Sequence, residues 1–123
     1  MGKPNDWTGR ITLVAAGLIG AVGVMAAAGA SHGGESRNLA AIAAICLAHG
    51  PALLALGLMG RGRVLTAAGL VLALGTAIFA GDLGMREWLG NGLFAGAAPS
   101  GGGAMILGWL GIALGGVLWR PKF

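Results

Sequence analysis

The chain has 123 residues, of which 56% are hydrophobic and only 10% are charged. Soluble domains carry about 25% charged residues, so this composition excludes an ordinary soluble domain. The formal net charge of +4 comes without a basic stripe interleaved with aromatic residues, and nucleic-acid binding is therefore not predicted. The single cysteine, Cys46, excludes an internal disulfide bond.

Four long runs without charged residues cover most of the chain: 11–34, 38–60, 64–81 and 88–119. Because an apolar helix needs about 20 residues to cross a bilayer, each run can supply one crossing. The sequence predicts an all-α integral membrane protein, with residues 1–123 as a single membrane domain. We expect its four transmembrane helices over these approximate ranges: 9–30, 38–59, 63–81 and 100–119. No room remains for a soluble catalytic domain.

Lysine and arginine are divided unequally between the two predicted sides of the membrane. Arg37 and Arg86 fall on one side. Six fall on the side of both termini: Lys3, Arg10, Arg61, Arg63, Arg120 and Lys122. The positive-inside rule then predicts that both termini face the cytoplasm. We expect a multi-pass protein of the bacterial inner (plasma) membrane, or of the mitochondrial inner membrane if the source is eukaryotic.

Three tryptophans fall near the ends of the predicted helices. Trp7 and Trp119 are expected at the interface on the terminal side, and Trp88 at the opposite one. Amphipathic indole rings concentrate at membrane–water interfaces. These residues are therefore predicted to act as interfacial anchors.

The connection 82–99 is the longest between predicted helices. Its segment 83–89 mixes apolar and charged residues at a spacing that fits a short helix lying in the interface. We expect three polar candidates at this outer rim, His32, Asp82 and Glu35, either clustered or individually solvated.

Glycines recur on single faces of two predicted helices. Gly17 and Gly20 lie in the first, and Gly108, Gly111 and Gly115 in the fourth. Small residues let transmembrane helices approach closely, so these glycines are predicted to be packing positions. The pattern leaves open whether the partner helix belongs to this chain or to another.

His49 lies near the middle of the second predicted helix. Ionisable residues at that depth are costly and often functional. Pro51 lacks an N–H and is expected to kink the helix beside it, and Cys46 lies one turn before His49. Trp109 reaches a similar depth in the fourth helix, so a structural hydrogen bond between its indole and His49 is favoured. A ligand-binding or proton-handling role for His49 is the alternative.

Other chemistry has little support in the residues. Cys46 and His49 supply two metal ligands, whereas zinc takes three or four, so no metal or cofactor is predicted and a metal- or haem-binding subunit is only the weaker alternative. No nucleophile–base pair, no paired intramembrane carboxylates and no dinucleotide fingerprint are present. The sequence predicts that the protein is not an enzyme.

Several short motifs, taken in order, resemble a known family. They are Ala27-Ala28-Gly29-Ala30-Ser31-His32-Gly33, His49 with Pro51-Ala52-Leu53-Leu54-Ala55-Leu56-Gly57, Phe79-Ala80-Gly81-Asp82-Leu83, Ala98-Pro99-Ser100-Gly101-Gly102 and Ile106-Leu107-Gly108-Trp109. Together they resemble domain-of-unknown-function family 423, which comprises YgdD-like bacterial inner-membrane proteins and eukaryotic transmembrane protein 256-like proteins. The resemblance implies a small helical membrane protein and implies no specific activity.

These observations favour a non-catalytic accessory or assembly subunit that acts through helix–helix and lipid contacts in a larger membrane complex. The expected partners are the lipid bilayer and other membrane subunits or further copies of the chain. The alternative is a small oligomeric transporter or channel that uses His49, the Pro51 kink and the rim formed by His32 and Asp82 as a polar path.

Overall fold

The computed structural model describes residues 6–33, 36–60 and 62–120, which form four α-helices. They are α1 (Asp6–His32), α2 (Arg37–Met59), α3 (Gly62–Leu89) and α4 (Ala97–Val117). Each is long and apolar enough to cross a membrane. The predicted fold class is therefore confirmed, and the chain is a multi-pass membrane protein.

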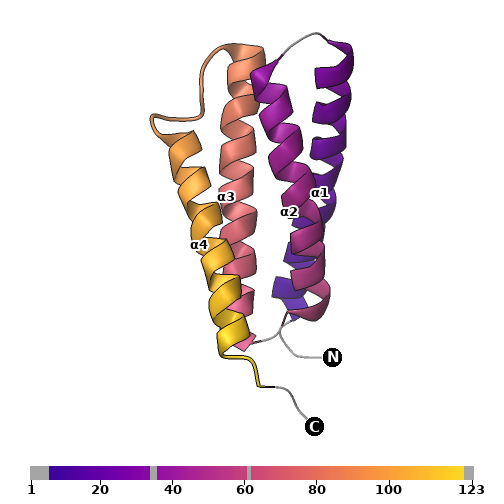
Figure 1. The fold of residues 1–123 in the computed structure, drawn as a ribbon. Coiled ribbons are helices and arrows are strands. Elements are labelled where there is room, and N and C mark those ends of the chain that lie inside the picture. The colour runs from indigo at the N-terminus through magenta and orange to yellow at the C-terminus, as the bar shows by residue number, and fades with distance from the viewer. Residues whose placement is uncertain (1–5, 34–35, 61, 121–123) are drawn as a thin grey trace.

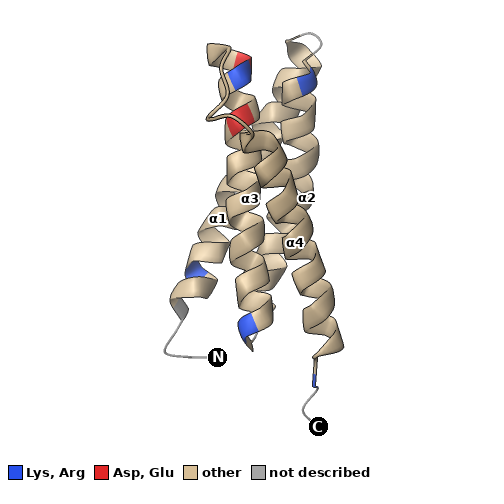
Figure 2. Cartoon of the chain, turned by 90° about the vertical axis from the view of Figure 1, so that its left-hand side faces the viewer, with Lys and Arg blue, Asp and Glu red and all other residues tan. Residues whose placement is uncertain are grey.

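The helices run alternately up and down, so both termini lie at one end of the bundle (Figure 1). We call this the terminal end. The opposite end, which holds the connections after α1 and after α3, is the loop end. Figure 2 shows acidic residues of α3 near the loop end.

The bundle consists of two helical hairpins, α1–α2 and α3–α4, joined mainly by packing of α2 on α3. α1 also touches α3. Within the described residues, no Cα atom of α4 lies within 8 Å of one in α1 or α2, so the backbone of α4 comes close to that of α3 alone (Figure 1). The bundle is thus open on the side of α4 rather than closed around one axis.

Buried apolar side chains form one core that extends through all four helices. Fully or almost fully buried members include Ile42 and Leu53 on α2, Leu72 on α3 and Met105 on α4. At most 33% of the most apolar stretch of each helix is buried inside the bundle. Most apolar side chains therefore face outward, as expected where the solvent is lipid.

α3 differs most from the sequence-based prediction. The loop expected from residue 82, with a separate interfacial helix, is wrong, because α3 continues without a break to Leu89. Asp82 and Arg86 form an i,i+4 ion pair that supports this last part of the helix. Gly90, with φ of +81°, then ends the helix in the left-handed conformation that glycine adopts most readily.

α4 begins at Ala97, three residues earlier than expected, and ends at Val117. Pro99 lies in its first turn, where the missing N–H costs no helical hydrogen bond. Gly96, with φ of +81°, precedes the helix. The other predicted helix ends agree with the structure to within three residues.

Candidate functional site

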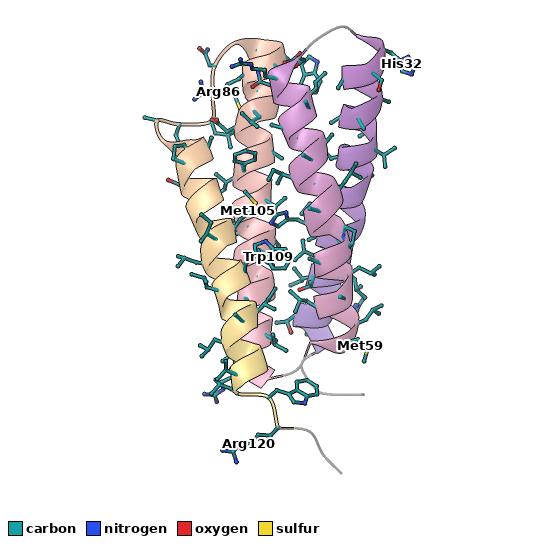
Figure 3. The ribbon with its side chains drawn as sticks, in the orientation of Figure 1. His32, Met59, Arg86, Met105, Trp109 and Arg120 are labelled. Atoms are coloured by element: carbon teal, nitrogen blue, oxygen red, sulfur yellow. The ribbon has the colours of Figure 1, made fainter. Side chains whose placement is uncertain are left out.

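The indole of Trp109 and the imidazole of His49 form a hydrogen bond between α4 and α2. Trp109 Nε1 donates to His49 Nε2 at 3.0 Å, and the two rings meet edge-to-face with centroids 5.6 Å apart. Figure 3 shows Trp109 reaching from α4 toward α2. The predicted structural pairing of these residues is therefore confirmed.

The second imidazole nitrogen is also engaged. His49 Nδ1 lies 2.9 Å from the carbonyl oxygen of Ile45, one turn earlier in α2. A carbonyl only accepts and an indole N–H only donates, so the geometry assigns the neutral imidazole with its proton on Nδ1. A second proton on Nε2 would point at the indole N–H and break the bond to Trp109.

This hydrogen bond is the polar link across the open side of the bundle. His49 is 6% exposed, whereas Trp109 is 43% exposed, so one ring is enclosed and the other borders the surrounding lipid. Because the backbones of α2 and α4 do not approach closely, the Trp109 side chain spans the distance between them. The pair thus ties the α3–α4 hairpin to the α1–α2 hairpin.

Pro51 and Cys46 flank His49 without joining this network. Pro51 lies inside α2, which the structure continues through it, and its ring is exposed. The kink expected at this position stays a prediction. Cys46 is a free, fully buried cysteine in the core, where it packs as a small apolar side chain.

Buried hydroxyls are satisfied by their own helices. Thr76 Oγ1 donates to the carbonyl oxygen of Leu72 at 2.7 Å, and Thr12 Oγ1 donates to that of Thr8 at 2.8 Å. Among the described residues, no buried side-chain nitrogen or oxygen lacks a hydrogen-bond partner. Each buried polar side-chain atom of the described residues therefore already has at least one partner within the bundle.

Metal-ligating residues are also dispersed. Within the described ranges, no three side chains of the types His, Cys, Asp and Glu come together. Both nitrogens of His49 are already occupied, and Cys46 adds a single sulfur. The weaker alternative of a metal- or haem-binding subunit gains no support from this arrangement.

At the loop end, Asp82 holds the α3–α4 connection against α3. Its side chain is fully buried and accepts from Arg86 Nε and from the backbone N–H of Leu93, each at 2.8 Å. Gly92 lies so close to Asp82 and Arg86 that a side chain there would collide with both. Asp82 is therefore a structural acceptor, and its partners differ from those predicted for the outer rim.

The other two predicted rim residues do not join Asp82. His32 is exposed at the end of α1 (Figure 3), which fits the solvated alternative. Glu35 lies outside the described residues. A rim interaction that the sequence did not predict is formed by Glu87, whose Oε1 accepts from Ser36 Oγ at 2.7 Å. Ser36 in turn caps α2 by accepting from Leu39 N at 3.1 Å.

The glycines of α4 pack against α3 within the same chain. A Cβ atom at Gly108 would lie 2.6 Å from Leu72 Cγ, one at Gly111 would lie 3.1 Å from the Cβ of Ala68, and one at Gly115 would lie 2.6 Å from Leu65 Cδ2. These three glycines lie where α4 contacts α3, so on this face of α4 the neighbouring helix belongs to the same chain.

The glycines of α1 give a mixed result. Gly20 meets Gly50 of α2, where a Cβ on Gly50 would lie 3.2 Å from the Gly20 Cα. Gly17 is exposed with open space around it, so it makes no close contact within the described bundle, and its packing against another chain stays a prediction. The sequence analysis missed Gly75 and Gly101, each of which would place a Cβ 2.8 Å from the other's carbonyl oxygen.

All three predicted anchor tryptophans are exposed near helix ends. Trp7 and Trp119 lie at the terminal end and Trp88 at the loop end. The Arg10 guanidinium lies over the Trp7 ring, 5.0 Å from its centroid, in the geometry of a cation–π contact. Their placement at a membrane interface stays a prediction.

Comparisons with protein-family models, with curated proteins and with solved structures gave no match. The resemblance to domain-of-unknown-function family 423 therefore stays a prediction that rests on the motifs alone.

Proposed function

We propose that this protein is a non-catalytic accessory or assembly subunit that acts through helix–helix and lipid contacts in a larger membrane complex. The observation that carries the proposal is the internal satisfaction of every buried polar side-chain atom in the described chain, beside helices whose apolar side chains mostly face outward. These buried polar atoms form hydrogen bonds within the bundle. What remains for other molecules is apolar surface.

The His49–Trp109 pair supports this assignment over transport. A proton or solute path through His49 would have to break the bond from Trp109 or the contact with the Ile45 carbonyl. Four helices also leave little space for a pore within one chain. A transporter would therefore need an oligomer and a rearranged His49.

The distribution of charge supports a cytoplasmic placement of the terminal end. Among the described residues, Arg10, Arg63 and Arg120 lie there (Figure 2), while Arg37 and Arg86 lie at the loop end. Arg86 is paired with Asp82, which reduces the effective positive charge at the loop end. We propose on this basis that the protein lies in a bacterial inner membrane, or in the mitochondrial inner membrane if the source is eukaryotic.

Native mass spectrometry of the full chain, extracted gently from its own membrane, tests the subunit role. We expect a hetero-complex of fixed stoichiometry. A chain that remains without protein partners, and that moves a solute when reconstituted in liposomes, would overturn the proposal.

His49→Leu then separates the two roles. A packing role predicts lower stability without a specific loss of flux, whereas a transport role predicts lost flux in a folded protein. Leu54→Ala, which changes an exposed residue of the same helix, is the matched control and is expected to change neither property.

A further inference from the structure

A groove of about 650 Å³ opens between α1 and α3 in the half of the bundle nearest the loop end. Leu18 contributes from α1, Cys46 from α2, and Thr76, Ala77 and Trp88 from α3. Its size falls within the range of about 300–1,000 Å³ typical of small-molecule pockets.

The groove follows from the way the two helices are packed. At the terminal end α1 and α3 are in contact, since a Cβ at Gly69 would lie 3.9 Å from the Thr12 methyl group, an ordinary van der Waals distance. Toward the loop end, the part of α3 that extends to Leu89 forms one wall of the groove. The cleft is therefore restricted to one half of the membrane-spanning bundle.

The groove has almost no polar character. Polar side-chain atoms in the lining belong to Thr76, Cys46 and the indole of Trp88; Thr76 and Cys46 are fully buried, and the Thr76 hydroxyl already donates to the Leu72 carbonyl. At its outer end, Trp88 lies back over Gly84, where a Cβ would be 3.4 Å from the indole Cζ3. The other side of the Trp88 ring is free to cover an occupant, since the residue is 71% exposed.

Depth and volume distinguish a lipid chain from a protein helix. Along α3, the lining from Thr76 to Leu89 spans about 20 Å at 1.5 Å per residue, close to the roughly 15 Å of hydrocarbon in one leaflet. A helix about 10 Å in diameter would occupy on the order of 1,600 Å³ over that length. That is more than twice the groove volume, so a whole helix does not fit inside the groove.

We propose that this groove binds one acyl chain of a phospholipid from the leaflet at the loop end, with Trp88 packing over the chain near the headgroup region. This inference is independent of the proposed accessory role, because lipid and protein partners are separate species in a mass spectrum. A missing protein partner would leave it untouched.

Native mass spectrometry of the full chain from native-lipid polymer discs, with stepwise removal of bulk lipid, tests the site. We expect one phospholipid to remain on the wild-type chain. Ala77→Phe places a ring in the groove and should lower the lipid-bound fraction, because the ring takes up the volume that the acyl chain would fill. Ala67→Phe makes the same change at an exposed α3 position outside the groove and should leave lipid retention unchanged.

A phospholipid with a photoreactive group in its acyl chain gives a second measurement on the unmodified chain, whatever the folding of the variants. Cross-links are expected at Met85 and Leu18, which line the groove, and not preferentially at Leu107, which is exposed on α4. Equal retention by Ala77→Phe in a folded protein, cross-links spread evenly over the outer helix faces, or a retained polyisoprenoid or second copy in place of a phospholipid would each overturn the proposal.

Discussion

Replacing His49 by leucine removes the hydrogen bond between α2 and α4 near the middle of the bundle. The change deletes the acceptor for Trp109 Nε1 and the contact with the Ile45 carbonyl. The carbonyl of Ile45 keeps its helical position, but the Trp109 indole N–H is left without a partner beside lipid, where no water replaces it. We therefore expect His49→Leu to lower the free energy of unfolding.

The size of the effect can be bounded from the structure. An orphaned donor costs about 1–3 kcal/mol in a protein interior. Hydrogen bonds between transmembrane helices contribute about 0.6 kcal/mol on average and up to about 1.7 kcal/mol, because the unfolded chain also finds partners in the membrane. We expect a loss of about 1–2 kcal/mol for His49→Leu, with a coupling energy of about 0.6–1.7 kcal/mol to Trp109.

A double-mutant cycle measures that coupling directly. Reversible unfolding in mixed micelles, followed by far-ultraviolet circular dichroism, would be recorded for His49→Leu, Trp109→Phe and the double variant. Trp119→Phe combined with His49→Leu is the control, and its effects should be additive, since Trp119 is exposed at the terminal end. A coupling energy between His49 and Trp109 below about 0.3 kcal/mol, the range in which independent sites add, would refute the reasoning.

Two further predictions concern packing and capping. Gly108→Ala should destabilise the bundle by about 1–3 kcal/mol, because its new methyl group would lie 2.6 Å from Cγ of the fully buried Leu72. Gly102→Ala is the control: a Cβ there has nothing within 4 Å, so this change should stabilise the bundle by up to about 1 kcal/mol. Equal unfolding midpoints for the two variants would contradict this account. Ser36→Ala removes the acceptor for Leu39 N and should lower the free energy of unfolding by about 0.5–2 kcal/mol. The measurement is hydrogen exchange, which should become faster in the first turn of α2. Unchanged exchange there would show that the cap contributes nothing.

The membrane class and helix number follow from the sequence because they depend on hydropathy and length alone. Hydropathy is a property that each residue carries without knowledge of the fold. The His49–Trp109 pair was also predictable, because hairpin connections fix the depth of each residue in antiparallel helices. His49 and Trp109 each lie near the middle of a span, and a buried imidazole requires a partner.

Helix packing was predictable only in part for the same reason. Glycine spacing identifies a flat face on α4, and the structure places α3 there. Spacing does not indicate whether a glycine face is turned inward or outward, so Gly17 was assigned to packing although it faces open space. The contact between Gly75 and Gly101 was missed because each is a lone close approach, recognisable only once the register of α3 against α4 is known.

The end of α3 shows how local charge misleads a boundary prediction, and the consequence extends to the groove. The charges at Asp82 and Arg86 mark the end of an apolar run, but the two side chains pair across one helical turn, and the remaining carboxylate oxygen accepts from Leu93 N. With its charge compensated in this way, Asp82 can lie fully buried inside a helix that continues to Leu89. That continuation carries Trp88 to the outer end of the α1–α3 groove. The wall that shapes the proposed lipid site therefore depends on hydrogen bonds of Asp82, which is not itself a lining residue, and loosening the Asp82 contacts should weaken lipid retention without altering a single residue of the groove.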